Sequence, residues 1–257
     1  MAEWIISFFP AHHCYIEPFG GSAAVLLNKP VSDVEIYNDL DGRIVELMDY
    51  IKEAPDRLFE EVYNMPYGRP VFQKLKKELI KDAKSGGLEP FERATRFFYI
   101  KNVVYGGFER GGPRISKVIN EATKYYQRCL GIFNISDRLR NVTLEKLDFR
   151  EIFKRYDGTE VLFYIDPPYY GIDQYGISFK EQDHIDLAAI LQKIKAKTIV
   201  SYYVLPEIMA MYPGWHVEKR YFVKGSVTSK MEDENFKPKE KGAEILLMNF
   251  KPELILF

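Results

Sequence analysis

Cysteine and long hydrophobic runs are what this sequence has least of. The 257 residues contain only two cysteines, Cys14 and Cys129, and these form no metal-binding pattern. Free thiols in a chain of this kind are typical of a reducing compartment. No apolar stretch approaches the ~20 residues that a membrane span requires, and no secretory signal peptide is recognisable. We therefore expect a soluble, cytoplasmic protein with no membrane partner.

Histidine is scarce as well, and its distribution argues against a metal centre. The four histidines are scattered, and none lies at the spacing of metal ligands: His12, His13, His184 and His216. Neither cysteine stands beside a plausible base, so we do not expect a cysteine nucleophile. The sequence predicts no metal site.

Charge is unevenly distributed, although the net charge of the whole chain is only −1. Residues 66–140 contain 16 Lys or Arg and 7 Asp or Glu, a net charge of +9, and the remaining residues carry −10. A basic segment within an acidic chain indicates a polyanionic partner such as nucleic acid. The alternative is a solvated helical face, which could be formed by Lys74, Lys76, Lys77, Lys81 and Lys84.

Short apolar runs alternate with helical patterns over much of the chain, which predicts an α/β fold. A strand, a glycine turn and the start of a helix are expected within residues 14–27. Further strands are expected at 34–39, 142–147, 161–165 and 198–202, with an antiparallel pair at 216–223 and 243–250. Residues 55–140 interrupt the alternation with helical patterns at 56–63, 71–83, 90–103 and 116–130. Other helical segments are expected at 1–10, after Asp39, and after a capping box formed by Ser178 and Glu181.

One buried strand, Val161–Ile165, stops abruptly at Asp166, Pro167, Pro168 and Tyr169. Proline has no N–H group for the ladder, so the strand must end near Asp166. Ligands of open α/β sheets bind just beyond the carboxyl ends of the strands. Asp166, the Pro167 carbonyl and Tyr169 are therefore candidates for chemistry. The alternative is an ordinary strand that ends in a proline turn with an exposed aspartate.

The first strand leads into a glycine turn, Glu17–Val25, and the second ends at Asp39. Glycines let the backbone approach a ligand closely at this position, although the pattern is not that of a dinucleotide site. An acidic residue at the end of the second strand often binds ribose hydroxyls. The alternatives are an ordinary turn for the glycines and a helix N-cap for Asp39.

A glycine-rich loop, Tyr105–Arg114, lies within the basic segment. Lys101 precedes the loop, Tyr105 is one of its aromatic residues, and Arg110 and Arg114 enter it. Such a loop can follow a phosphate backbone, with arginines reaching phosphates or base edges. The alternative is a plain connection between helices. A second polar stretch, 225–242, is expected to be a mobile loop.

Taken together, these motifs resemble those of the Dam-type adenine-specific DNA methyltransferases. EPFGGSAAV at 17–25 is similar to the cofactor motif of that family, YNDLD at 37–41 to its acidic motif, and DPPY at 166–169 to its catalytic motif. The order of the motifs matches too, and the similarity is weakest across residues 55–140.

The resemblance implies a fold, a cofactor and a set of roles. The fold would be a Rossmann-like, seven-stranded, mostly parallel sheet of the class I methyltransferase type, formed by residues 1–54 and 141–257. Residues 55–140 would be an inserted helical lobe that recognises double-stranded DNA. S-adenosylmethionine would be held by Glu17, Gly21, Asp39, Phe149 and Asp166, and catalysis would involve Asp166, Pro167 and Tyr169. DNA would be bound by Lys101, Tyr105, Arg110 and Arg114.

Two positions depart from the family pattern. Ala23 stands where a second glycine is usual, and an aromatic-x-Gly-Gly-Lys motif normally precedes the first helix, whereas this chain begins inside that helix. Either the start is shorter than in relatives, or cofactor binding is weak. Two other functions therefore stay open: an RNA base-amine methyltransferase, and a shortened DNA-binding homologue with little activity.

Overall fold

Seven strands form a single sheet within the part of the chain that the structure describes. The structure is a computed structural model, and it describes residues 1–104, 111–170, 179–223 and 241–252, without the side chains of 222, 223 and 241–243. The strands are β1 (Cys14–Glu17), β2 (Val34–Asn38), β3 (Val142–Glu145), β4 (Val161–Ile165), β5 (Lys197–Tyr203), β6 (His216–Val223) and β7 (Lys241–Met248). Each lies within a few residues of its predicted position.

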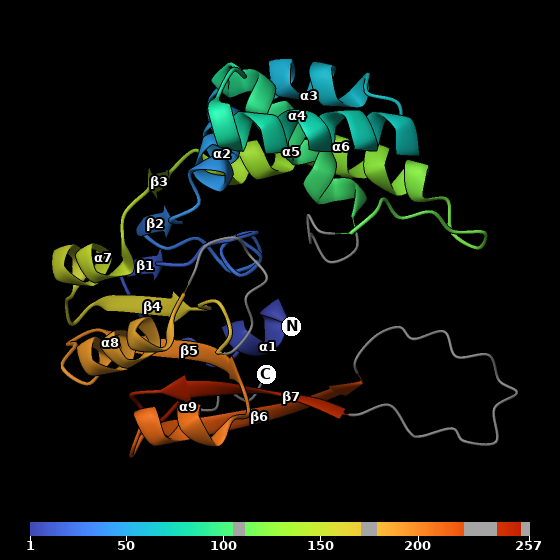
Figure 1. The fold of residues 1–257 in the computed structure, drawn as a ribbon. Helices are drawn as coiled ribbons and strands as arrows, with labels where there is room; N and C mark the ends of the chain where they lie inside the picture. Colours follow the sequence, from blue (N-terminus) through green and yellow to red (C-terminus); the bar gives the residue numbers. More distant parts are fainter. Residues whose placement is uncertain (105–110, 171–178, 224–240, 253–257) are drawn as a thin grey trace, which may run out of the picture.

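The strand order is β3-β2-β1-β4-β5-β7-β6, and Figure 1 shows the strands stacked in this sequence. The first five strands pair in parallel, and β7 runs antiparallel to both β5 and β6. The predicted seven-stranded, mostly parallel sheet with a closing antiparallel pair is confirmed. β1 and β4 lie side by side although more than a hundred residues separate them, so the strand order reverses between them.

The helices are α1 (Ala2–Ile6), α2 (Gly42–Glu53), α3 (Pro55–Tyr63), α4 (Arg69–Ser85), α5 (Pro90–Val103), α6 (Glu121–Leu139), α7 (Phe149–Tyr156), α8 (Glu181–Leu191) and α9 (Pro206–Met211). The expected helix at 116–130 begins later and ends later than predicted. Asn120 caps α6, because its side chain accepts a hydrogen bond from the Thr123 N–H. At the start of α8, the Lys180 N–H donates to Asp183 at 2.8 Å. Ser178 of the predicted capping box lies outside the described residues.

The sheet buries both faces, and side chains alternate between two cores along each strand. On one face, residues such as Tyr15, Tyr37 and Tyr164 pack against α1 and the helices α2–α6. On the other face, Ile16, Phe163 and neighbouring strand residues pack against α7, α8 and α9. None of the helices described here is long and apolar enough to cross a lipid bilayer.

The helices α2–α6 form a separate layer beyond β3, at one end of the row of strands (Figure 1). Within this layer α2 packs against α5 and α6, and α4 packs against α5. α6 is tied to the sheet by Arg138, which donates to the buried carboxylate of Glu35 on β2 and to the Leu26 carbonyl. The core is therefore continuous from the sheet into the helical layer.

Candidate active site

Three acidic residues end adjacent parallel strands at the same edge of the sheet. Glu17 is the last residue of β1, Asp39 follows β2, and Asp166 follows β4. Because β1 and β4 are the strands between which the order reverses, this edge is the topological switch point, where α/β sheets bind ligands. The structure thus brings together three of the residues that the sequence analysis selected.

The glycine turn after β1 is shaped by close contact with β2. A Cβ atom added at Gly20 would lie 2.1 Å from the Tyr37 ring, so only glycine can occupy this position. Gly21 has a φ of +50°, which favours glycine, and the Tyr37 hydroxyl donates to its carbonyl at 2.6 Å. The turn is therefore fixed against the second strand.

Asp39 holds the same turn from the end of β2. Its Oδ2 accepts a hydrogen bond from the Gly21 N–H at 2.8 Å, and its Oδ1 accepts one from the Asp41 N–H at 2.8 Å. The N-cap of α2 is Asp41, whose Oδ1 accepts from the Arg43 N–H, so the alternative of Asp39 as the cap is wrong. Burial raises the pKa of Asp39, and the nearby positive charge of Lys101 opposes this rise.

Glu17 is buried and faces the inside of the turn. Its Oε1 accepts from the Tyr15 hydroxyl and from the Leu26 N–H, both at 2.7 Å. Burial raises the pKa of Glu17 to about 8, and the negative charge of Asp166 contributes to the rise. These contacts make Glu17 a fixed support for the segment that follows the glycines.

The segment after the glycine turn is not the helix that the sequence predicted. Residues 21–28 form successive turns, with only isolated helical hydrogen bonds such as that from the Leu27 N–H to the Ala23 carbonyl. Ala23, where a glycine is usual in the family pattern, has a φ of +55° and is fully buried. The left-handed conformation of an alanine costs roughly 1–2 kcal/mol, which interrupts a regular helix at this point.

Asp166 lies at the end of β4, and Pro167 beside it is buried. The Asp166 side chain reaches solvent, yet protein surrounds its other sides. Desolvation, followed by the negative charge of Glu244, raises the pKa of Asp166 to about 7, while a hydrogen bond with Tyr169 opposes the rise. Water that reaches the carboxylate screens part of the effect of Glu244.

Tyr169 is held from β5 and β7. Its ring packs on Tyr203 with centroids 4.2 Å apart and an angle of 31° between the planes. Its hydroxyl donates to Glu244 Oε1 at 3.5 Å, and the Ser201 hydroxyl donates to the same oxygen at 2.8 Å. Sequence reasoning missed Glu244 and Ser201. The one signal available was an acidic residue within the apolar strand that runs to Met248.

Phe149, the other residue expected to contact a cofactor, is buried in an aromatic cluster at the start of α7. Its ring lies 5.6 Å from those of both Phe19 and Phe179, measured between centroids. The Arg150 guanidinium lies 4.2 Å from the centroid of the Phe149 ring. Phe19 follows β1 within the glycine motif, so the cluster connects that motif with α7.

The residues selected for DNA binding are only partly described. Tyr105 and Arg110 lie outside the described residues. Lys101 lies on α5, where its charge lowers the pKa values of both Asp39 and Asp41, so it lies near the acidic motif. The two ends of the glycine-rich loop meet in a bridge between Val104 and Pro113, and the Arg114 N–H donates to the Val103 carbonyl.

The lysines of α4 form one exposed face of the helical layer. Lys74, Lys77, Lys81 and Lys84 are exposed, and Lys76 is half-buried with its Nζ donating to the Gly111 carbonyl at 3.1 Å. Two arginines of the same segment are engaged in ion pairs: Arg93 pairs with Glu46 and Asp82, and Arg96 pairs with Glu78. On α4 itself, the exposed positive charge is carried largely by lysine.

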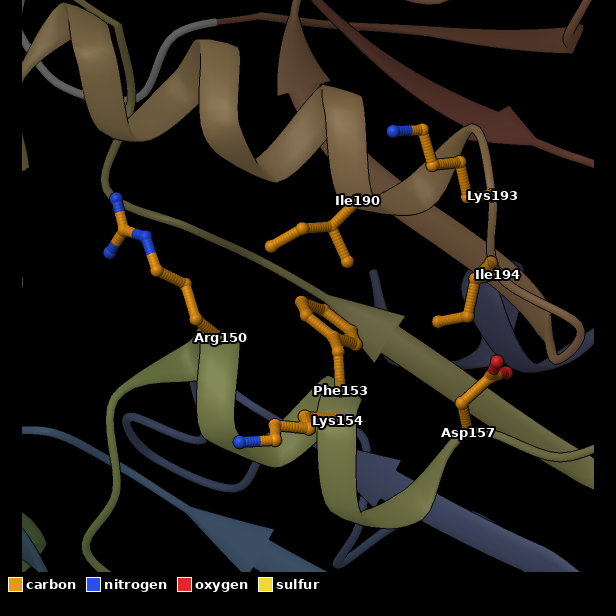
Figure 2. A pocket seen from close by; sticks show the side chains of 7 residues that line it. All are labelled: Arg150, Phe153, Lys154, Asp157, Ile190, Lys193 and Ile194. Carbon is orange, nitrogen blue, oxygen red and sulfur yellow. The ribbon is translucent and has the colours of Figure 1, made fainter.

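The pocket in Figure 2 lies between α7 and α8. It has a volume of about 330 Å³, and Phe153, Ile190 and Ile194 form its apolar wall. Arg150 at one end pairs with Asp183 and Asp186 of α8. None of the site residues selected from the sequence lines this pocket. The ion pairs of Arg150 connect the two helices on either side of it.

Metal and thiol chemistry receive no support from the described residues. They contain no group of His, Cys, Asp and Glu that could hold a metal ion. Burial raises the pKa of Cys14, and it raises the pKa of Cys129 to about 11, which keeps both thiols protonated at neutral pH.

The strand order, the glycine turn, the acidic residue of β2 and the Asp-Pro-Pro-Tyr segment define a class I methyltransferase-like protein. Residues 1–229 match the D12 class N6 adenine-specific DNA methyltransferases, and the chain belongs to that family. It is also similar to the type II methyltransferase M.CviBI of Paramecium bursaria Chlorella virus NC1A. The identity is 25% over an alignment of 234 residues, and the match covers 80% of this chain and 80% of the relative. The chain therefore belongs to a family of enzymes that methylate the N6 position of adenine in DNA.

Proposed function

We propose that the chain transfers a methyl group from S-adenosylmethionine to the N6 amino group of an adenine that has left a DNA duplex. The observation that carries this proposal is the position of Asp166, beside the glycine turn and at the switch point of the sheet. The family assignment favours DNA over the alternative of an RNA base amine.

The residues at the ends of β1 and β2 fit the methyl donor. Each oxygen of the Asp39 carboxylate accepts one backbone hydrogen bond. A carboxylate oxygen can accept a second hydrogen bond, which a ribose hydroxyl could donate. The glycine turn leaves no side chain between the backbone and a ligand at this edge. Gly21, Asp39, Glu17 and Phe149 are proposed as the cofactor site, with Glu17 acting through the turn that it supports.

S-adenosylmethionine supplies an electrophilic methyl group on a positively charged sulfur. The Asp166 carboxylate and the Pro167 carbonyl accept hydrogen bonds from the two amino hydrogens of adenine. This pair favours a pyramidal nitrogen with a free lone pair and stabilises the positive charge that develops there. The amine is too weak an acid to lose its proton first, so the proton leaves after transfer. Tyr169 stacks on the target ring.

The helical insert, 55–140, is proposed as the target-recognition lobe for double-stranded DNA. Its exposed lysines and the glycine-rich loop would contact phosphates, with Lys101, Tyr105, Arg110 and Arg114 as the first residues to test. Phosphate contacts would offset the few kcal/mol that removal of a base from the stack costs.

The test is transfer of labelled methyl groups to duplex DNA, followed by detection of N6-methyladenine. Asp166→Ala should abolish methylation while the melting temperature stays close to that of the wild type. Glu160→Ala, in which the lost carboxylate is exposed just before β4, at the end of the strand opposite to Asp166, is the control and should retain turnover. Near-normal turnover of Asp166→Ala would remove Asp166 from catalysis.

Calorimetric titration with S-adenosylmethionine separates an enzyme from a binding module. Binding of the donor together with methylation supports the proposal. Affinity for DNA without any heat from the donor would instead identify a DNA-binding homologue with little activity. If a structured RNA accepts methyl groups better than duplex DNA does, the proposal that DNA is the substrate is wrong.

A further inference from the structure

A buried carboxylate on β7 lies beside the Asp-Pro-Pro-Tyr segment and belongs to none of its motifs. Glu244 is 8% exposed, and Ser201 on β5 is fully buried. A buried carboxylate is costly unless hydrogen bonds compensate it, and strand positions that face a core are normally apolar. Both of the hydrogen bonds of Glu244 Oε1 come from hydroxyl groups, those of Ser201 and Tyr169.

The antiparallel ladder explains why these groups meet. Tyr203 of β5 pairs with Glu244 of β7, and Ser201 lies two residues before Tyr203. Directly paired residues and those two positions away project from the same face of a sheet. Ser201, Tyr203 and Glu244 therefore form one surface, and Tyr169 rests on it from the end of β4.

This surface contacts Tyr169 at two points. Tyr203 packs against the ring, with centroids 4.2 Å apart, and Glu244 accepts the hydrogen bond of the hydroxyl. A phenol ring that is held at both its face and its tip loses little rotational freedom when a ligand stacks on it. Such preorganisation lowers the entropic cost of forming the productive complex.

We propose that Glu244 and Ser201 are positioning residues that orient Tyr169, so that its ring is set before the target base arrives. The inference rests on the proposed function and extends it from the motif to β5 and β7. Glu244 acts through the Tyr169 hydroxyl, and Ser201 fixes the Glu244 carboxylate. Tyr203 supports the ring from the side opposite to the base.

A double-mutant cycle tests the link between Glu244 and Tyr169. At about pH 8.5, where Asp166 is ionised in every variant, Glu244→Ala and Tyr169→Phe should each lower kcat about tenfold, with a smaller change in KM for DNA. The double variant should be no worse than Tyr169→Phe alone, because Glu244 acts through the hydroxyl that this variant already lacks. A loss equal to the product of the two single losses, or a normal kcat for Glu244→Ala, overturns the proposal. Glu218→Gln on the adjacent β6 is the matched control and should leave kcat unchanged.

A second measurement does not depend on turnover. With ¹³C-labelled tyrosine, the ring resonance of Tyr169 is identified by its loss in Tyr169→Phe. It should shift in Glu244→Ala and Ser201→Ala, and stay in place in Glu218→Gln. An unchanged resonance in a folded Glu244→Ala protein overturns the positioning role. If the wild type does not methylate DNA, the proposed function fails, and the resonance still decides whether Glu244 orients Tyr169.

Discussion

At the scale of single residues, the proposed acceptor role of Asp166 predicts that catalysis depends on pH. In the proposed mechanism the carboxylate form accepts the amino hydrogens, and desolvation and the charge of Glu244 raise the pKa of Asp166 to about 7. We expect kcat/KM to rise with pH between about 6 and 8 as Asp166 loses its proton, and then to level off. Glu244→Gln removes the neighbouring negative charge, so the rise of kcat/KM should occur at lower pH in this variant. A profile that is flat from pH 6 to 8 contradicts the prediction.

His184 predicts a pH dependence of stability that is independent of catalysis. The side chain is 1% exposed, its Nδ1 lies 2.7 Å from the Tyr202 hydroxyl, and burial lowers its pKa to about 4. The unfolded chain therefore binds a proton near pH 6.5 that the folded chain excludes. Stability is fully present above pH 6.5 and is lost as pH falls toward 4, by an amount on the order of 3 kcal/mol.

The measurement is the melting temperature at pH 7.5, 6 and 5 for the wild type and for His184→Gln. The variant starts lower, because it loses a packed ring, but its curve should fall less steeply. Other groups, such as Glu17 with its raised pKa, act equally in both proteins and cancel in the comparison. Parallel curves for the two proteins would assign the acid sensitivity to other residues.

At the scale of elements, the glycine turn between β1 and β2 is the most constrained segment of the site. Gly20→Ala would place a Cβ atom 2.1 Å from the Tyr37 ring, which is fixed by its hydrogen bond to Gly21. Overpacking of this kind costs about 1–3 kcal/mol, and the displaced turn would also weaken methyl-donor binding. Chemical denaturation and calorimetric titration measure the two effects.

Gly131 provides the matched control for this substitution. It lies in α6, and a Cβ atom there would meet nothing within 4 Å. Gly131→Ala should raise stability by up to ~1 kcal/mol, because alanine favours the helix, and should leave donor binding unchanged. Equal effects of the two substitutions would show that the Tyr37 contact does not constrain the turn.

Elements of this fold were predictable where local pattern and tertiary packing agree. The predictions were accurate for the strands at 161–165 and 198–202 and for the helix at 90–103. Each is a clear apolar run or helical pattern with a proline near one of its ends. The helix expected after Gly21 did not form. Its sequence favours a helix, but the positive φ of Ala23 and the hydrogen bond from the Leu26 N–H to Glu17 set turns instead. Such tertiary contacts form only in the folded chain and leave no periodic pattern in the sequence.

The candidate site divides in the same way. Asp166, Asp39 and Gly21 stand at the ends of recognisable strands, so the sequence alone could select them. Glu244 could not be selected, because its contact with Tyr169 depends on the register between β5 and β7, whose paired residues lie more than forty positions apart in the sequence. Lys101 was chosen for its basic surroundings, and only the packing of α5 reveals its proximity to Asp39.

At the scale of the whole molecule, acidic and basic regions are separated. Three carboxylates lie at the ends of β1, β2 and β4, whereas a row of exposed lysines lies on α4, in the helical layer (Figure 1). A cationic methyl donor and a polyanionic duplex would thus each face a region of opposite charge.

This separation predicts how DNA affinity responds to salt. Each phosphate contact releases counterions, so the logarithm of the binding constant should fall with the logarithm of salt concentration by about 0.9 per contact. Replacement of Lys74, Lys77 and Lys81 by Gln should reduce that slope by about 1 or more and weaken binding at low salt. Fluorescence anisotropy with a labelled duplex at 50–200 mM salt measures this dependence of the binding constant on salt.

The control replaces Lys154, Lys193 and Lys195, which are exposed near α7 and α8, and should leave the slope unchanged. Equal slopes for the two triple variants would mean that α4 is a solvated face and that the duplex lies elsewhere.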